Sequence, residues 1–532
     1  MRLAGKQRVS QVYPLGAPIL GLNDTDSIAD MDPKYALDML NVFPELGALK
    51  VRWGYVEHVT GMTDNGKTLM VFNNQDGTSK LFCTTDDGIF DVTASTASPS
   101  NVKALTEGEM VWTQFANIAG QWLIACNGVD APVIYDGTTW TSFSNVASPT
   151  NPGELETGTL TVANIAYVHV HKNRLWFIEK DTLSAWYLPL NAVSGTPVEF
   201  PLGGIFTKGG QLNALFSLTM DSGIGSDDVL VFQSTKGEVG GYIGANPADA
   251  ADWRIIARYF IGAPLGKKTN VQLNGDILLL TEFGVVSLLD VVNGLYRLGA
   301  EASTASAKIS RTISNIVRDG AGAPLWEIFN SPVYQYVIIS VPENIALGIP
   351  AKQLVMNSVT GAWTKFDLPA LTLYEFGQNI FFTDLSGRVH KYGGNTNDEI
   401  TLAGTGAVSI ISGFQQAYSF FEQPTVKKHF KMVKPIFQAS NEPQVVMKVL
   451  TDYLPGGVNS VNTPGEAAVP PVNSWDSTEW DEGQWLRTLV AFQTFLGSTG
   501  FGYSGSVIVK LRTSVETRYL ASHWIYEQGL SL

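Results

Sequence analysis

The sequence feature that most constrains the fold is a short phrase that recurs about seven times between residues 70 and 395. In each copy an apolar strand is followed by a Gly, Asn or Asp turn and by a second apolar or aromatic strand, as in SKLFCTTDDGIFDV and QNIFFTDLSGRVHKYGG. The first strands can be anchored at Leu81, Trp122, Leu175, Val229, Ile277, Tyr336 and Ile380. Their spacing averages roughly 50 residues, a period typical of propellers and repeat arrays. We therefore expect a radial stack of small antiparallel sheets.

The repeat predicts an all-β fold with a six- to eight-bladed β-propeller, seven blades being the best count. We expect an N-terminal platform segment at 1–62, the propeller at 63–400 and a C-terminal β platform domain at 401–532. A Pro/Gly/Asn-rich stretch at 454–474 can bury little apolar surface and is expected to be a mobile loop. Because the last blade ends well before the C-terminus, the segments at the two chain ends are expected to form one β-rich platform.

Two helices are expected outside the repeat. Asp32 and Pro33 have the pattern of an N-cap followed by proline at the first helical position, which predicts a short helix over KYALDMLN. In the segment 301–320, Ile309 and Ile313 recur at helical spacing with Ile316 and Val317, which predicts an amphipathic helix between blades five and six. Blades five and seven show only three obvious strands each.

The charge balance limits the partners of this chain. The formal net charge is −14 and the pI is near 4.9, which argues against a surface that holds nucleic-acid phosphates. It does not exclude a surface past which nucleic acid moves. Cys83 and Cys126 occupy strands, so we expect two buried free thiols rather than a disulfide. The chain start lacks the apolar core of a signal peptide and no segment is apolar enough to span a membrane, which indicates a soluble protein made in a reducing cytosol.

Motifs for chemistry are incomplete. GAPLGKKT at 262–269 has three rather than four residues between its glycines, so we interpret it as a turn with two exposed lysines rather than a phosphate-binding loop. His169 and His171 share one strand face, but no nearby histidine or cysteine completes a metal site. GYSGS at 502–506 departs from the G-x-S-x-G pattern. We predict no catalytic residue, metal or cofactor, while paired carboxylates for sugar hydrolysis stay open.

Two clusters stand out from the composition. One is a run of lysines in KKHFKMVK, and the other is the aromatic and acidic sequence WDSTEWDEGQW at 475–485. The residues concerned are Lys427, Lys428, Lys431 and Lys434 in the first, and Trp475, Asp476, Glu479, Trp480, Asp481 and Trp485 in the second. Alternation along a strand places Lys428 and Lys434 on one face and Lys427 and Lys431 on the other.

Each cluster has more than one interpretation. The lysine run is typical of an edge strand that lysine protects from aggregation. The tryptophans are typical of a buried corner, or of a sugar or choline site. An acidic loop that faces the basic strand of a neighbouring copy in a ring explains both clusters together.

Both ends of the chain also carry a family resemblance. The opening YPLGAPILGLNDTDSIADMDPKYALDMLNVFPELGALKVRWGY resembles the start of the tail nozzle proteins of short-tailed bacteriophages, of the tail tubular protein B and packaged-DNA stabilisation type. The matching pieces are Pro33 to Asn41, Phe43-Pro44, and Arg52 to Gly54, with Trp53 where proline would be common. The strand KKHFKMV and the closing WDSTEWDEGQW and HWIYEQG are similar to the last domain of that group.

The resemblance implies a structural virion protein and not an enzyme. It implies six copies in a ring-shaped tail nozzle, assembled in the host cytoplasm, which docks under portal-adaptor proteins and meets tail fibres or spikes. Double-stranded DNA would be retained and then conducted through the lumen without specific binding. The candidate gate loops carry Glu154, Glu156, Pro455, Asn459 and Glu466.

Two other functions stay open at the level of sequence. A carbohydrate-binding or glycoside-cleaving propeller would use the aromatic and acidic content of the chain. A propeller adaptor for host proteins would fit the repeat but leaves the two end segments unexplained.

Overall fold

The structure is a computed structural model that divides the chain into two compact units. It describes residues 10–221, 226–297, 304–319, 326–342, 352–465, 489–493 and 495–528. The propeller unit comprises Glu57–Lys352 and Leu368–Lys391, and the platform unit comprises Met1–Val56, Gln353–Asp367 and Tyr392–Leu532. The boundaries thus fall at 56/57 and 391/392 rather than at 62/63 and 400/401, and 353–367 belongs to the platform unit.

The propeller unit is built from antiparallel sheets that follow one another along the chain. The first three are β6 (Thr68–Asn73), β7 (Ser79–Thr85), β8 (Gly88–Asp91) and β9 (Ser100–Ala104); β10 (Val111–Asn117), β11 (Gly120–Cys126), β12 (Val133–Tyr135) and β13 (Trp140–Ser142); and β16 (Ile165–His171), β17 (Arg174–Glu179), β18 (Ser184–Tyr187) and β19 (Val198–Pro201). A short parallel pair, β14 (Ser144–Val146) and β15 (Glu154–Glu156), and the 3-10 turn η1 (Val162–Asn164) lie between the second and third sheets.

The next four sheets complete the unit. Their strands are β20 (Leu212–Asp221), β21 (Ser226–Ser234), β22 (Glu238–Ile243) and β23 (Arg254–Phe260); β24 (Asn270–Leu273), β25 (Asp276–Thr281) and β26 (Gly284–Ser287); β27 (Glu327–Ser331) and β28 (Tyr336–Val341); and β31 (Leu373–Phe376), β32 (Asn379–Thr383) and β33 (Val389–Tyr392), joined by β5 (Tyr55–Val59). Within the described residues this makes seven sheets, and each predicted anchor lies in the second strand of one of them.

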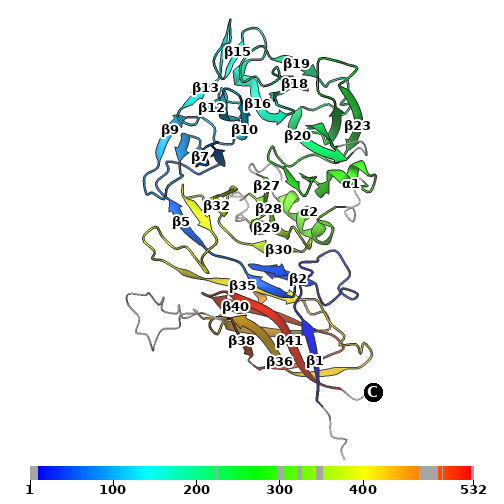
Figure 1. The fold of residues 1–532 in the computed structure, drawn as a ribbon. Coiled ribbons are helices and arrows are strands. Elements are labelled where there is room, and N and C mark those ends of the chain that lie inside the picture. Colours follow the sequence, from blue (N-terminus) through cyan, green and yellow to red (C-terminus); the bar gives the residue numbers. More distant parts are fainter. Residues whose placement is uncertain are drawn as a thin grey trace, which may run out of the picture. The chain divides into compact units, whose positions relative to one another are not determined.

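The first strands of the sheets line the inside of a closed ring (Figure 1). The inner strand β16 contacts β10 and β20, and β27 contacts β24 and β31. The remaining contacts join β11 to β6, β20 to β25 and β31 to β6, which closes the circle. The unit is therefore the β-propeller that the repeat predicts.

Apolar side chains between consecutive sheets hold the ring together. Trp176 in β17 is fully buried, stacks on Trp253 with ring centroids 5.6 Å apart, and meets the edge of Phe232 in the next sheet. Aromatic pairs of this kind each add roughly 0.5–1.5 kcal/mol beyond the area they bury. The alternation of aromatic and aliphatic residues in the repeat thus becomes the packing between blades.

The fifth blade departs from the pattern that the sequence predicts. Within the apolar run GVVSLLD, β26 ends at Ser287 and the helix α1 (Leu288–Val292) follows. The Ser287 side chain accepts a hydrogen bond from the backbone N–H of Asp290, which is an N-cap interaction. The predicted amphipathic helix exists as the 3-10 turn η3 (Ala307–Ile309) and α2 (Ser310–Asp319), with Ile309 and Ile313 buried.

The platform unit is a sandwich of two antiparallel sheets. One sheet contains β1 (Ser10–Gly16), β3 (Val42–Glu45), β4 (Ala48–Val51), β41 (Thr517–Gln528), β36 (Lys428–Ala439), β38 (Val490–Gln493) and β39 (Leu496–Gly502). The other contains β2 (Ala36–Leu40), β34 (Asn397–Asp398), β35 (Val408–Gln416), β40 (Gly505–Thr513) and β37 (Gln444–Thr451). The hairpin of β29 (Lys352–Asn357) and β30 (Trp363–Phe366) and the 3-10 turn η5 (Val458–Ser460) complete the unit. Strands from both chain ends therefore form one β-rich platform.

The segment KYALDMLN is a strand, so the predicted helix there is wrong. β2 pairs antiparallel with β35, and Ala36 and Met39 of β2 are fully buried. The Asp32 carboxylate accepts the backbone N–H of Lys34 in a turn, as an aspartate does when it caps a helix. The capping pattern was present locally, but pairing with a strand some 370 residues away, as in Met39 with Phe414, decided the conformation.

A buried arginine ties the platform together. Arg52, directly after β4, bonds both carboxylate oxygens of Asp398 at 2.7 Å and reaches Asp367 at 3.2 Å. Its Nε donates to Asn41 Oδ1 at 2.9 Å. One side chain thus connects the N-terminal segment, the 353–367 segment and the C-terminal segment.

Candidate axial binding site

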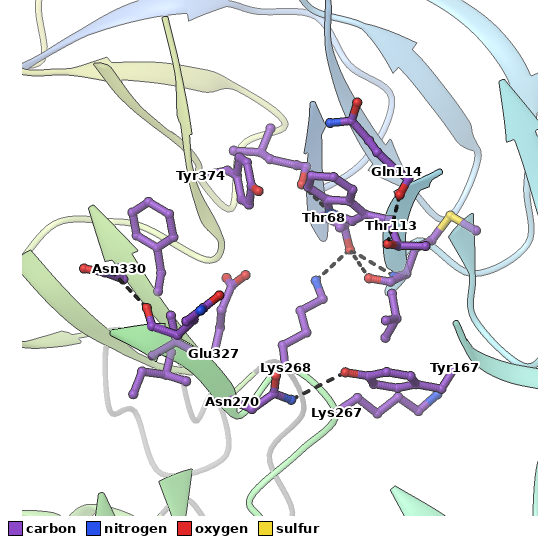
Figure 2. A pocket seen from close by; sticks show the side chains of 18 of the residues that line it. Thr68, Thr113, Gln114, Tyr167, Lys267, Lys268, Asn270, Glu327, Asn330 and Tyr374 are labelled. Carbon is purple, nitrogen blue, oxygen red and sulfur yellow. Dashed lines mark hydrogen bonds between the residues drawn. The ribbon is translucent and has the colours of Figure 1, made fainter. Parts of the chain in front are cut away.

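A cavity of the propeller unit lies on the axis of the ring. It has a volume of about 500 Å³ and is lined by residues of the inner strands β6, β10, β16, β24, β27 and β31 (Figure 2). The polar side chains that line it are those of Thr68, Thr113, Gln114, Tyr167, Lys267, Lys268, Asn270, Gln272, Glu327, Asn330 and Tyr374. Six blades therefore contribute to one site, because each inner strand presents side chains to the axis.

The turn 262–269 closes one end of this cavity, and its lysines are not exposed as the sequence predicted. Lys268 reaches across the axis, where its Nζ donates to Thr68 Oγ1 at 2.7 Å and to the carbonyl of Lys67 at 3.1 Å. Lys267 Nζ donates to the carbonyl of Asn127 at 3.1 Å. The interpretation of GAPLGKKT as a turn with two exposed lysines is therefore wrong: it fixes blade five to the first blade and to the β11–β12 turn of the second blade.

The same end carries a network of buried hydroxyls. Thr68 Oγ1 accepts from Lys268 and from the backbone N–H of Met110, and donates to the carbonyl of Gly108 at 3.0 Å. Thr84 Oγ1 donates to that same carbonyl at 2.5 Å. Because these groups are buried and satisfy one another, they make a rigid floor for the cavity.

Glu327 is the acidic side chain that lines the cavity among the described residues. Its Oε2 accepts the hydroxyl of Thr372 at 2.8 Å and the backbone N–H of Leu373 at 3.3 Å. Burial raises the pKa of Glu327, and the nearby Lys268 ammonium opposes that rise. Figure 2 places the Glu327 carboxylate and the Lys268 amine in the same space, so the floor presents both an acceptor and a donor.

The opposite end opens into a second cavity of about 310 Å³ that shares part of its lining with the first. The shared residues include the rings of Trp112, Phe329 and Tyr374, whose centroids are 5.1 Å apart for Trp112–Tyr374 and 5.8 Å apart for Phe329–Tyr374. The Trp112 indole N–H donates to the carbonyl of Leu69 at 3.1 Å, which fixes that ring. Burial raises the pKa of Tyr374 to about 12. The axial space therefore has the polar groups of Lys268 and Glu327 at one end and aromatic rings at the other.

The two histidines singled out in the sequence lie on β16. His169 Nε2 and His171 Nδ1 both lie within hydrogen-bond distance of Ser217 Oγ in β20, at 3.0 and 2.7 Å. Burial lowers the pKa of His169 to about 3, with the neighbouring His171 as a second cause, so this histidine is neutral at physiological pH. Among the described residues no cluster of three metal-ligating side chains is found.

The lysine run does not form the edge strand that the sequence suggested. β36 is an interior strand, with β41 on one side and β38 and β39 on the other. Lys428 is fully buried, and its Nζ donates to the carbonyls of Gln423, Val426 and Tyr503 at 2.6, 3.0 and 2.9 Å. Lys428 therefore has no exposed surface for a subunit interface, and that part of the prediction is corrected.

A bulge between Phe430 and Met432 also changes the predicted faces of β36. Lys428 shares the buried face with Phe430 and Val433, whereas Lys434 lies on the other face, over the ring of Phe495 at 5.0 Å. Simple alternation placed Lys428 and Lys434 together, and the extra residue of the bulge reverses that parity. Lys427 is exposed, and Lys431 lies 3.5 Å from Glu527.

The other predicted site residues divide between the described and the undescribed parts of the chain. Trp475, Asp476, Glu479, Trp480, Asp481, Trp485 and the gate candidate Glu466 lie outside the described residues. Pro455 and Asn459 flank Val458, which is buried and whose backbone N–H donates to Asp38 Oδ2 at 2.9 Å. The first part of the predicted mobile loop, up to residue 465, thus lies against the platform.

The gate candidates Glu154 and Glu156 are held within their own loop. The Glu154 carboxylate accepts the backbone N–H groups of Thr150 and Asn151 and the side-chain amide of Asn151, at 2.8–2.9 Å. The hydrogen bond from the Asn151 side chain is the first of the causes that lower the pKa of Glu154 to about 2. Glu156 accepts the hydroxyl of Thr196. The 147–158 loop is therefore held by its own residues at Glu154 and by Thr196, outside the loop, at Glu156.

Two other expectations can be checked in the described residues. Cys83 and Cys126 are buried free thiols, as predicted, and burial raises the pKa of each to about 12. Every helix in the described part of the chain is too short or too polar to cross a membrane.

Comparison with known proteins gives structural likenesses only. No protein-family model and no curated protein matches the sequence. Among solved structures, YCF48 bound to D1 peptide is 10% identical over 64% of this chain and 94% of its own, with a TM-score of 0.36. The Cps50 (Swd1) β-propeller domain of Myceliophteria thermophila is 13% identical over 64% of this chain and 99% of its own, with a TM-score of 0.37. An exo-β-1,3-galactanase from Phanerochaete chrysosporium, solved with galactose, is 10% identical over 79% of this chain and 97% of its own, with a TM-score of 0.26. At these values the likenesses carry no conclusion about function.

Proposed function

We propose that this chain is a structural subunit of a ring-shaped phage tail nozzle, and that its ring retains and then conducts double-stranded DNA. The observation that carries the proposal is that strands from both ends of the chain build the platform unit. Its two sheets combine strands from the first 56 residues with strands from Tyr392 onward, and the propeller is a separate unit. The sequence resemblance of both chain ends implies this organisation.

The distribution of basic residues supports a passive conduit. Several cationic side chains are engaged inside the units, as Arg52 is with Asp398 and Lys428 with three carbonyls. Lys510 is buried and donates to the carbonyl of Val461. Tight binding to DNA needs cationic side chains that neutralise phosphates. A net charge of −14 with such lysines and arginines used internally favours repulsion of the DNA backbone.

The propeller axis itself is not the proposed path for DNA. Lys268 and Thr68 join opposite parts of the ring wall across that axis, and a cavity of about 500 Å³ holds a small molecule rather than a duplex. A lumen wide enough for DNA therefore requires several copies around a common axis. Heterologous, head-to-tail contacts of one chain generate closed rings of this kind.

The first test is the assembly state of the purified full-length chain. Size-exclusion chromatography with light scattering and negative-stain microscopy should reveal a ring of about six copies, as the resemblance implies. The ring should bind duplex DNA weakly at physiological salt, without sequence preference. A monomer at all concentrations up to those used for microscopy, in the presence and absence of DNA, refutes the proposal.

The second test concerns the predicted interface and omits Lys428, because that side chain is buried. The double variant Lys427→Glu and Lys431→Glu should dissociate the ring if the basic strand faces the 475–485 segment of an adjacent copy. Lys103→Glu with Lys236→Glu, in the propeller unit, makes the same charge change and should leave assembly intact. Equal melting temperatures for the two variants exclude misfolding. Normal rings from the first variant contradict the pairing.

A further inference from the structure

The axial cavity of the propeller is bounded at one end by the 262–269 turn. At one end the 262–269 turn is fixed by bonds from Lys267 to Asn127 and from Lys268 to Thr68. At the other end the cavity continues into the 310 Å³ space that shares the residues around Trp112 and Tyr374. A volume of about 500 Å³ lies within the range of roughly 300–1,000 Å³ typical of small-molecule sites.

The lining offers hydrogen bonds of both kinds. The Lys268 amine, which has three N–H groups and bonds to Thr68 and to the Lys67 carbonyl, and the amide of Gln114 can donate. The Glu327 carboxyl and the side-chain oxygen of Thr113 can accept. Asn330, which lines both cavities, has a buried Oδ1 without a hydrogen-bond partner among the described residues, although its Nδ2 donates to the carbonyl of Gln272. That oxygen is enclosed by the protein, so it is not among the groups that a ligand in the cavity reaches.

The aromatic and ionic parts of the lining favour a neutral ligand. Trp112, Phe329 and Tyr374 give apolar ring faces near the open end. At the floor the Lys268 amine and the Glu327 carboxyl lie in the same space, so a ligand hydroxyl can accept from the first and donate to the second. Ring faces combined with paired donors and acceptors suit a molecule with both C–H faces and hydroxyl groups.

We propose that the axial cavity binds one neutral, hydroxyl-rich small molecule, of the size of a mono- or disaccharide. The aromatic rings contact its apolar faces, while Lys268, Glu327, Thr113 and Gln114 bond its hydroxyls. This site belongs to each propeller separately, so it does not depend on ring formation or on the nozzle proposal.

Binding is tested on the full chain with glucose, galactose and maltose, by saturation-transfer difference NMR and isothermal titration calorimetry. At least one of these sugars should bind with a Kd below about 10 mM and a stoichiometry of one per chain. The variant Thr113→Trp, which fills the cavity, should weaken that binding at least about tenfold. The matched control Thr141→Trp, exposed on the outermost strand of the same blade, should bind as the unmodified chain does.

A second variant keeps the test decisive if Thr113→Trp does not fold. Thr113→Val removes one hydroxyl at nearly constant volume and should raise the Kd about three- to tenfold, with an unchanged melting temperature. Inorganic phosphate and glucuronate serve as charged probes. No binding of any neutral sugar, tighter binding of either anion, or unchanged sugar binding by both variants overturns the proposal. Because assembly is measured separately, failure here leaves the ring proposal standing.

Discussion

Replacement of Arg52 by leucine should remove much of the stability of the platform unit. The guanidinium is 2% exposed and makes two 2.7 Å bonds to Asp398, which is 16% exposed, and one of 3.2 Å to the half-exposed Asp367. Burial by itself would lower the pKa of Arg52, but Asp398 and Asp367 raise it above its ordinary value. The arginine is therefore charged in the native state, and its main partner lies in a largely dry site.

The magnitude follows from these contacts. Loss of one member of a buried ion pair costs about 3–5 kcal/mol, because the remaining charge stays buried without its counterion. The Asp367 contact adds up to about 1 kcal/mol, since its carboxylate is half exposed. For a unit of this size, each kcal/mol lowers the melting temperature by about 2–4 °C, which gives a fall of roughly 10 °C.

Differential scanning calorimetry measures this fall as a shift of the platform transition. Arg52→Lys keeps the charge but not the bidentate fork, and should lose about half as much. The double variant Arg52→Leu with Asp398→Leu should recover most of the loss, because neither charge is then buried. A shift below about 2 °C for Arg52→Leu, or a double variant less stable than the single one, would refute the reasoning.

Three further predictions rest on single side chains. Lys268→Met removes the hydrogen bonds to Thr68 and to the Lys67 carbonyl, and should lower the free energy of unfolding of the propeller unit by about 1–3 kcal/mol, measured by calorimetry. The control Lys236→Met replaces an exposed side chain and should have no effect. Burial lowers the pKa of Lys428 from 10.5 to about 8, so on raising the pH the native state releases this proton before the unfolded state does. In urea titrations, the free energy of unfolding relative to Lys428→Met should be constant below about pH 8 and rise up to about pH 10.5. A fall over that interval contradicts the assignment. Cys83 and Cys126 should not react with a thiol reagent in the native protein and should both react in denaturant, and rapid native reaction of either refutes their burial.

The sequence was sufficient to predict the repeating part of the fold, because the strands and turns of each blade are encoded by residues close together in the chain. A strand, a Gly or Asn turn and a second strand need only neighbouring residues, so Leu81 and the other anchors could be placed in blades. KYALDMLN shows the limit of such local signals, since β2 is a strand owing to its pairing with β35. The end of β26 at Ser287 is a second case, where a capping serine starts α1 within an apolar run.

The candidate site could not be derived from the sequence in the same way. Thr68, Thr113, Lys268 and Glu327 are about 40 to 260 residues apart, and only closure of the ring brings them to one axis. Signals of two kinds were nevertheless present. GAPLGKKT departed from the repeat between blades four and five, and Glu327 was a carboxylate directly before the apolar pair Ile328 and Phe329 of an inner strand. Lys428 was misjudged because periodicity does not reveal whether a strand is at an edge or inside a sheet.

A few lysine and arginine side chains of this chain make internal contacts. Arg52 joins three segments of the platform, Lys268 crosses the propeller axis, and Lys428 donates to three carbonyls at the start of β36. Because Arg52 and Lys428 are buried, the surface field is more negative than a count over equally exposed residues would give. These internal cations also link the stability of each unit to the proposed function. A variant that exposes one of these cations should weaken its unit and add a phosphate-binding group, so that in the proposed ring it should bind DNA more tightly than the unmodified chain does.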